Sequence, residues 1–225
     1  MAAMTTKINV YYWGFLGRQT PIVRMLEHTG TEYNMITDRA VFADVMSKFG
    51  NTSSDCFAPP CVKDGDFVIS QSTACSMYIG KKLNLTPPGY DDYKTMQWLS
   101  DIVDVFEGGV GKSNEHGPTL KKFLEGGRWV SLMSNLESGI NGPFYLGAEP
   151  CAADFFLASM ISHRASSLFA PIKDKYGFDA MANFQKAQGV HDALASTDAW
   201  KNYSALNPMF GPIKEEILNA YNDEA

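Results

Sequence analysis

Residues 58–72 constrain this chain more than any other stretch, because a proline corner, a hairpin and a helix start follow one another there. Pro59 and Pro60 make the corner. Asp64 and Gly65, between two short apolar runs, are typical of a tight β-hairpin turn. The stretch therefore predicts a sheet edge that binds a small molecule, with a turn and a capped helix as the alternative interpretation.

The helix in this stretch is predicted to begin at Ser70 or Ser72, either of which can cap the first turn. Strands are expected at residues 61–62 and 67–69, on either side of the hairpin turn. A helix start exposes N–H groups and a partial positive charge. The pair Gln71 and Ser72 is therefore the expected seat of a ligand carboxylate.

Length and composition place the chain among ordinary globular proteins. Its 225 residues, with 45% hydrophobic and 20% charged side chains, are enough for one large domain or two small ones. The net charge of −6 gives no electrostatic footprint for nucleic acid or an anionic membrane. No run approaches the ~18 apolar residues of a membrane span, and the N-terminus lacks a secretory signal. We therefore expect a cytoplasmic protein without nucleic-acid or membrane partners.

The cysteines and histidines are not spaced like the ligands of a metal ion. Neither a Cys-x-x-Cys pair nor a linked Cys/His pattern occurs among Cys56, Cys61, Cys75, Cys151, His28, His116, His163 and His191. We expect reduced, structural thiols and no metal site.

The order of predicted elements indicates a fold of the α/β plus all-α class. The first elements are a strand at 7–13, a helix from Thr20 to before Gly30, a strand at 33–36, a short helix at 42–49 and then the hairpin and its helix. This order predicts a thioredoxin-like N-terminal domain over residues 1–85. A proline-rich linker at 86–92 leads to an all-helical C-terminal domain over 93–225, with a central buried helix at 154–161.

The glycine-rich run at 108–113 ends like a phosphate-binding loop. That loop requires a glycine five residues before the glycine of its Gly-Lys-Ser end, and Phe106 stands there instead. The preceding residues also have a helical period. We therefore expect the glycines to break a helix that lines a pocket, with nucleotide binding as the minor alternative.

Four segments carry a resemblance to a known family. Residues 12–29 resemble the first strand and helix of the mu, alpha and sigma glutathione transferases, and residues 60–72 resemble their cis-proline and glutamyl-binding segment. Residues 147–154 resemble the family's helix-capping box, and residues 208–212 resemble the mu-class tail. The chain is thus similar to the cytosolic glutathione transferases of the tyrosine type, without a clear class.

The resemblance implies a glutathione-binding N-terminal domain, a hydrophobic co-substrate site in the helical domain, and a homodimer. The implied activity is that of a glutathione transferase, which conjugates the glutathione thiolate to small hydrophobic electrophiles in cytoplasmic detoxification. A glutathione-dependent isomerase or peroxidase is an alternative. A non-catalytic binding or structural protein with the same fold is another.

The resemblance also assigns residues to the reaction. Tyr12 takes the position of the catalytic tyrosine, whose hydroxyl stabilises the thiolate of a thiol with an ordinary pKa of ~8.5. Arg18 matches an arginine that adds positive charge near the sulfur. Tyr11 should face the other side of the strand and is the natural control.

The implied glutathione contacts surround these two residues. They are Tyr12, Trp13, Arg18, Lys48, Pro59, Pro60, Gln71, Ser72 and Asp104. Asp104 would come from the neighbouring subunit and bind the γ-glutamyl amine, with Asp101 as the alternative. Trp13 and Lys48 would meet the glycyl end.

Three positions depart from the family pattern. Pro59 stands before the predicted cis-proline, where it lacks the N–H that would pair with glutathione; this should weaken binding by about 1 kcal/mol, unless Ala58 does the pairing. Leu16 replaces a usual arginine. Cys151 is a poor helix cap, so that Asp154 alone is expected to hold the capping box.

Overall fold

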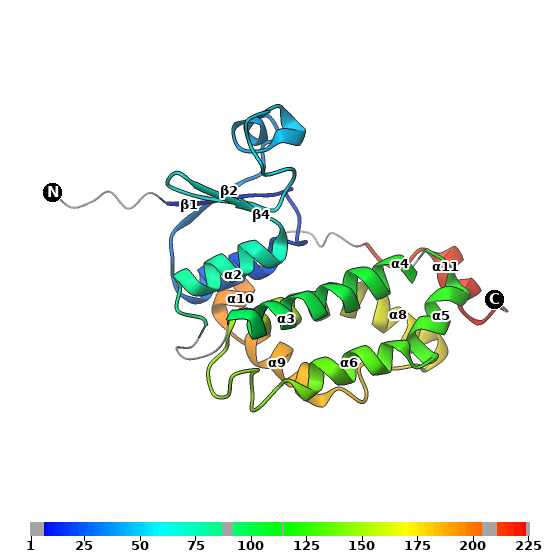
Figure 1. Ribbon diagram of the computed structural model, residues 1–225. Helices are drawn as coiled ribbons and strands as arrows, with labels where there is room; N and C mark the ends of the chain where they lie inside the picture. Colours follow the sequence, from blue (N-terminus) through cyan, green and yellow to red (C-terminus); the bar gives the residue numbers. More distant parts are fainter. Residues whose placement is uncertain (1–6, 87–91, 114, 204–210, 224–225) are drawn as a thin grey trace.

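The computed structural model describes residues 7–86, 92–113, 115–203 and 211–223, and it has two parts (Figure 1). A small sheet with two helices against one face forms the N-terminal part, and a larger helical part packs beside it. Most of the predicted linker at 86–92 and of the mu-like tail at 208–212 lies outside the described residues. The thioredoxin-like domain followed by a helical domain is confirmed.

The sheet has the strand order β2-β1-β3-β4. Its strands are β1 (Ile8–Tyr11), β2 (Tyr33–Ile36), β3 (Cys61–Asp64) and β4 (Phe67–Ser70). β1 is parallel to β2 because α1 (Thr20–His28) carries the chain back between them, whereas β3 is antiparallel to both neighbours. The predicted strand at 33–36 is confirmed. The first strand is shorter than predicted, because only residues 8–11 pair with β2.

The hairpin turn lies one residue later than predicted. Asp64 pairs with Phe67, so the two turn residues are Gly65 and Asp66. Gly65 has φ +61°, a backbone conformation that glycine adopts without a steric penalty. Asp64 instead belongs to β3, where Tyr78 donates a hydrogen bond of 2.6 Å to its carboxylate.

Residues 41–57 cover the face of the sheet opposite to α1 and α2 (Ser72–Lys82) (Figure 1). The predicted short helix is two 3-10 helices, Val41–Asp44 and Ser47–Phe49, because Val45 and Met46 leave helical geometry and bury their side chains between them. Together with the sheet they form an outer cluster, whose buried members are Tyr11, Phe42, Val45, Met46, Cys56 and Cys61.

The helical part surrounds α7 (Ala152–Arg164), of which only Ser162 is not buried, and the prediction of a central buried helix is confirmed. The other described elements there are α3 (Asp92–Val103), the π-helix η3 (Asp104–Val110), α4 (Gly111–Ser113), α5 (Gly117–Glu125), α6 (Arg128–Ser138), the π-helix η4 (Ala165–Phe169), α8 (Ala170–Tyr176), α9 (Gln185–Ala195), α10 (Asp198–Asn202), α11 (Glu215–Asn219) and η6 (Ala220–Asn222). One continuous core joins α7 to α1 and β1.

The glycine run does not break its helix, contrary to the prediction. The helix of α3 continues through the π segment η3 into α4. A Cβ on Gly109 would lie 2.3 Å from the ring of Phe123, so the glycine lets α5 approach this closely. A Cβ on Gly108 would meet nothing nearer than 4.0 Å. The glycines therefore serve helix packing, and only one of them is sterically required.

Asp154 holds the start of α7, but not alone as predicted, because the Cys151 side chain also accepts from the backbone N–H of Asp154 and completes the capping box. Its carboxylate accepts hydrogen bonds from the backbone N–H groups of Cys151 at 2.8 Å and Tyr145 at 2.9 Å. Burial raises the pKa of Asp154 to about 6, while these donors act in the opposite direction. The carboxylate thus ties the turn before α7 to the helix itself.

Candidate functional site

Three strands end together at one edge of the sheet, and their next residues form the candidate site. Tyr11 of β1 pairs with Cys61 of β3, which pairs with Ser70 of β4. The register therefore brings Tyr12, Pro60 and Gln71, each one residue beyond a pairing, to the same edge. The peptide bond between Pro59 and Pro60 is cis. Three of the predicted site residues are thus brought together by strand pairing alone.

Tyr12 lies beneath the turn that joins β1 to α1. Its side chain is 2% exposed, and its hydroxyl oxygen accepts a hydrogen bond of 3.1 Å from the backbone N–H of Arg18. Burial raises the pKa of Tyr12, whereas the N–H and the charge of Arg18 act against that rise. Among the described residues, no hydrogen bond uses the Tyr12 O–H as donor.

Gly17 is sterically required above the Tyr12 hydroxyl. A Cβ at Gly17 would lie 2.6 Å from the hydroxyl oxygen, whereas one at Gly14 would meet no atom within 4 Å. The Gly17 N–H also donates to the side-chain oxygens of Gln19 at 3.1 Å and Thr20 at 3.0 Å. These bonds hold the turn in the shape that directs Arg18 N–H at Tyr12.

Arg18 reaches across to the helical part. Its guanidinium forms an ion pair with the carboxylate of Glu107 in η3, and the Glu107 side chain is the more buried of the two. Sequence reasoning did not find Glu107, because a single glutamate before a glycine run carries no local signal. Only the packing of the two parts brings Glu107 to Arg18.

Trp13 and Lys48 lie on the side of the corner that the outer cluster occupies. The Trp13 ring packs against Phe42 and Phe49, with ring centroids 5.2 and 5.8 Å apart. Lys48, the neighbour of Phe49, is exposed, and its N–H donates to the carbonyl oxygen of Phe57 at 3.2 Å. The fold thus places both predicted residues near one another, on the β1 and 47–49 side of the site.

The start of α2 differs from the prediction. The helix begins at Ser72, and Gln71 holds the N-cap position with φ +76° and no side-chain cap bond. Neither Ser70 nor Ser72 therefore caps it, because Ser72 is already the first helical residue. Ser72 is buried, whereas Gln71 is exposed at the edge of the sheet. The first backbone N–H groups of α2, which have no partner within the helix, therefore begin next to an exposed residue.

The two aspartates of the helical part differ in their surroundings. Asp101 accepts hydrogen bonds from Gln97 at 3.4 Å and Asn135 at 3.3 Å. Asp104 is exposed at the start of η3, one turn after Asp101. Asp104 is thus the more accessible carboxylate for a neighbouring molecule.

The cysteines offer no nucleophile at this edge. All four are free and buried, and burial raises the pKa of the Cys61 thiol to about 12. Across the described ranges, no group of three or more His, Cys, Asp or Glu side chains could hold a metal ion. The same residues include no helix with the length and apolar character needed to cross a bilayer.

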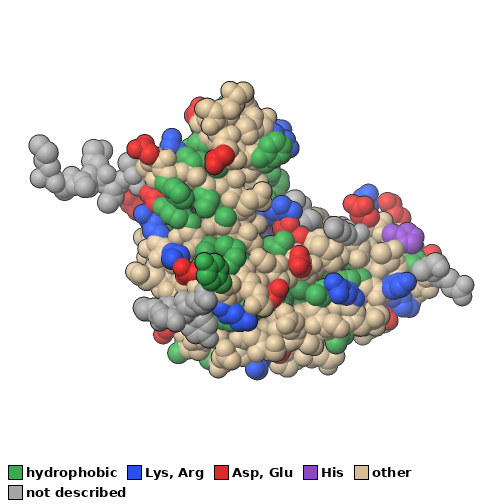
Figure 2. All heavy atoms as spheres, in the orientation of Figure 1, with side chains coloured by type: hydrophobic (Ala, Val, Ile, Leu, Met, Phe, Trp, Pro, Cys, Tyr) green, Lys and Arg blue, Asp and Glu red, His purple; other side chains and the backbone are tan. Residues whose placement is uncertain are grey.

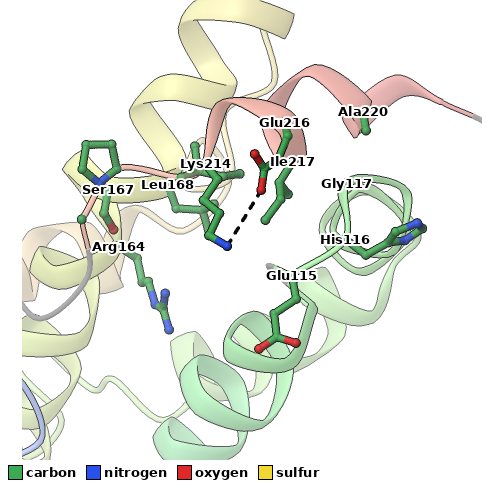
Figure 3. Close-up of a pocket in the computed structure, with 13 residues that line it drawn as sticks. Glu115, His116, Gly117, Arg164, Ser167, Leu168, Lys214, Glu216, Ile217 and Ala220 are labelled. Carbon is green, nitrogen blue, oxygen red and sulfur yellow. Dashed lines mark ion pairs between the residues drawn. The ribbon is translucent and has the colours of Figure 1, made fainter.

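A pocket of about 640 Å³ lies between the C-terminal segment, residues 115–117 at the start of α5, and the segment that leads from the end of α7 into η4 (Figure 3). None of the predicted site residues lines it. Arg164 and Lys214 form its basic wall, and Lys214 pairs with Glu216 at 3.9 Å. Gly117 lets the C-terminal helix close one side, because a Cβ there would lie 2.5 Å from the Ala220 backbone.

Comparison of the sequence with protein-family models and with curated proteins gave no match. Solved structures do match. A glutathione transferase Omega 3C from Trametes versicolor superposes with a TM-score of 0.67 at 14% identity, over 87% of each chain. A glutathione transferase family member from Pseudomonas fluorescens, with two glutathione molecules bound, has a TM-score of 0.66 at 17% identity, over 89% of this chain and 93% of that one.

A Pi-class glutathione S-transferase from Onchocerca volvulus has a TM-score of 0.64 at 20% identity, over 88% of this chain and 92% of that one. These likenesses span both the sheet and the helical part. The chain therefore has the fold of the cytosolic glutathione transferases.

Proposed function

We propose that this protein is a glutathione transferase that conjugates the glutathione thiolate to small hydrophobic electrophiles. The observation that carries the proposal is the corner where Tyr12, Pro60 and Gln71 meet at one edge of a thioredoxin-like sheet. Residues 1–85 would hold glutathione, residues 86–92 would link the domains, and residues 93–225 would supply the hydrophobic co-substrate site.

Tyr12 is the proposed thiolate stabiliser. Its O–H would donate to the sulfur while its oxygen keeps the bond from Arg18 N–H, which polarises the phenol. Each unit by which the thiol pKa falls corresponds to about 1.36 kcal/mol of preference for the thiolate. Arg18 would add a positive charge beside the same sulfur.

The remaining contacts follow the arrangement of the edge. Ser72 and the first N–H groups of α2 would take the γ-glutamyl carboxylate beside Gln71, because a helix start favours an anion. Asp104 of a partner subunit would take the amine. Trp13 and Lys48 would meet the glycyl carboxylate. The cysteinyl backbone would pair with the carbonyl of Pro59 alone, because Pro59 has no N–H.

A homodimer is part of the proposal. Phe57 is 62% exposed just before the proline corner, and Tyr93 at the start of α3 is 83% exposed. Figure 2 shows further hydrophobic side chains over the β3–β4 hairpin and α2, where Phe67 packs against Tyr78. Apolar surface of this kind marks a protein interface. By light scattering we expect the mass of two chains, and a smaller mass for Phe57→Ser.

Detoxification in the cytoplasm is the proposed role. Four free, buried cysteines suit a reducing compartment, where disulfides are rare. The helical part would supply the apolar wall for the electrophile beside Arg18 and Glu107.

Calorimetric titration with glutathione, combined with an ultraviolet scan for the bound thiolate, tests the proposal. Binding with thiolate absorbance at neutral pH is the expected result. Turnover of a panel of hydrophobic electrophiles would then identify the substrate class, and product analysis would separate conjugation from isomerisation or peroxide reduction.

A non-catalytic glutathione-binding or structural protein is the second candidate. Two observations favour it: Pro59 removes one donor from the site, and the Tyr12 side chain is almost completely buried. Binding without thiolate absorbance would indicate a binding protein. No binding at millimolar glutathione would indicate a structural one.

A further inference from the structure

Two arginines from different parts of the molecule act on Glu107. Glu107 pairs with Arg18 of the β1–α1 turn. Arg164, the last residue of α7, donates to the carbonyl of Phe106, the residue before Glu107, and acts on Glu107 electrostatically. Burial raises the pKa of Glu107, and both arginine charges act in the opposite direction. The carboxylate is thus a half-buried negative charge that pairs with Arg18 and is favoured by the charge of Arg164.

Two π segments create this arrangement. Glu107 lies within η3, and Arg164 immediately precedes η4. Arg164 is 3% exposed, and its Nη2 donates a hydrogen bond of 3.4 Å to the carbonyl oxygen of Phe106 in η3. A Cβ on Gly111, the first residue of α4, would lie 3.7 Å from that nitrogen, so Arg164 packs at van der Waals distance against the end of η3. Departures of this kind from α-helical geometry are frequent at functional sites.

Arg18 connects this charge cluster to Tyr12. Its backbone N–H donates to the Tyr12 hydroxyl, while its guanidinium pairs with Glu107. One residue therefore contacts both the candidate thiolate stabiliser and the carboxylate. Because Glu107 offsets the Arg18 charge, the positive potential at the hydroxyl depends on whether residue 107 is ionised.

We propose that Glu107 is a positioning residue that sets the charge acting on the Tyr12 hydroxyl and, through it, on the glutathione sulfur. The part that concerns the sulfur rests on the proposed function. Glu107 holds the Arg18 guanidinium toward the helical part and limits how strongly it favours the thiolate. The charged groups that face it are Arg18 and Arg164, with Asp104 one turn earlier on its own helix.

Glu107→Gln separates the charge from the contact, because glutamine keeps an oxygen that accepts from Arg18 but carries no charge. Glu107→Ala removes both. The matched control is Glu32→Gln, which removes the same charge from the exposed ion pair with Lys7, at the ends of β1 and β2 opposite to Tyr12.

The first measurement is the pKa of the bound glutathione thiol, from the ultraviolet absorbance of the thiolate against pH. In Glu107→Gln we expect it to fall by roughly one unit, because the positive charge of Arg18 is no longer offset. Glu32→Gln should match the parent protein. A thiol pKa in Glu107→Gln that is unchanged or higher would overturn the proposal.

The second measurement needs no glutathione. The tyrosinate absorbance of the free protein, minus that of its Tyr12→Phe derivative, gives the titration of Tyr12. This pKa should also fall in Glu107→Gln. If the pKa of Tyr12 falls in Glu107→Gln although the parent protein binds no glutathione, the effect of the Glu107 charge on Tyr12 is confirmed and the proposed function is wrong. If the pKa of Tyr12 is the same in Glu107→Gln and in the parent protein, the charge of Glu107 does not act on Tyr12 and this inference is wrong.

Discussion

The β1–α1 corner and the buried histidine of α7 differ in how their polar groups are held. At the corner, short-range hydrogen bonds determine the geometry: Arg18 N–H donates to the Tyr12 hydroxyl, and Gly17 N–H donates to Thr20. In α7, His163 is 3% exposed, and neither ring nitrogen has a hydrogen-bond partner in the described part of the chain. Packing alone holds that side chain in place.

The difference suggests where a substitution should act. A change at the corner should alter the chemistry, because it moves hydrogen-bonding atoms by small distances. A change around α7 should alter stability, because it disturbs packing and buried charge. The corner and the packed helical part each offer a matched glycine pair for the test, since Gly17 and, in η3, Gly109 are sterically required whereas Gly14 and Gly108 are not.

The largest effect is expected for Tyr12→Phe. Loss of a hydrogen bond to a charged sulfur costs about 2–3 kcal/mol, which corresponds to roughly a 100-fold loss of turnover. Glutathione affinity should change much less, as steady-state kinetics and calorimetry would show. Tyr11→Phe is the control, because Tyr11 lies in the outer cluster. An equal loss in the control would refute the role of Tyr12.

Gly17→Ala should have the next largest effect. The new Cβ would lie 2.6 Å from the Tyr12 hydroxyl oxygen and displace the ring. We expect about 2 kcal/mol less thiolate stabilisation, measured as a higher pKa of the bound thiol. Gly14→Ala should leave that pKa unchanged. Equal behaviour of the two variants would mean that the turn adapts and does not direct the hydroxyl.

Gly109→Ala should lower stability and leave the thiol chemistry nearly intact. The Cβ would overlap the Phe123 ring at 2.3 Å, and overpacking of this kind costs about 1–2 kcal/mol in the free energy of unfolding. Urea denaturation of this variant beside Gly108→Ala measures the difference. If Gly108→Ala is equally destabilised, backbone geometry rather than the Phe123 contact requires glycine in η3.

The smallest effect is the pH dependence that His163 contributes. Burial, with Arg24 and Arg164 nearby, lowers the pKa of His163 from 6.5 to about 3. Because the pKa of His163 is lower in the folded state than in the unfolded state, His163 contributes fully to stability at a pH above its unfolded pKa of 6.5. This stability is lost as the pH falls toward the pKa of the folded state. Between pH ~7 and ~5.5 the parent protein should therefore lose about 1 kcal/mol more unfolding free energy than His163→Phe.

Urea titrations at both pH values measure this loss. His116→Gln, at an exposed histidine, should behave like the parent protein. A parent protein and His163→Phe variant with the same pH dependence would show that His163 does not stay neutral in the folded state.

Local pattern was sufficient for most of the sheet and for the edge of the site. The strand at Tyr33–Ile36, the helix begun by Pro21 and the buried helix α7 follow from residues close in the chain. The corner was predictable for the same reason, since short strands and a two-residue turn leave little freedom in register. The one-residue error at the turn arose because Asp64 forms a strand pair with Phe67.

Tertiary packing decided the rest. Periodicity predicted the helix only as far as Phe106 and a break at the glycines, whereas the helix continues through η3, where Gly109 packs against Phe123 of α5 and the Phe106 carbonyl accepts from Arg164 of α7. The pairing of Arg18 with Glu107 joins residues far apart in the sequence, and no pattern on either side announces it. The sequence by itself thus determined most of the elements, because those depend on near neighbours, and it pointed to Tyr12 only through the resemblance to the glutathione transferases. Only the packed molecule determined which charges surround that tyrosine, because an ion pair needs both partners in space.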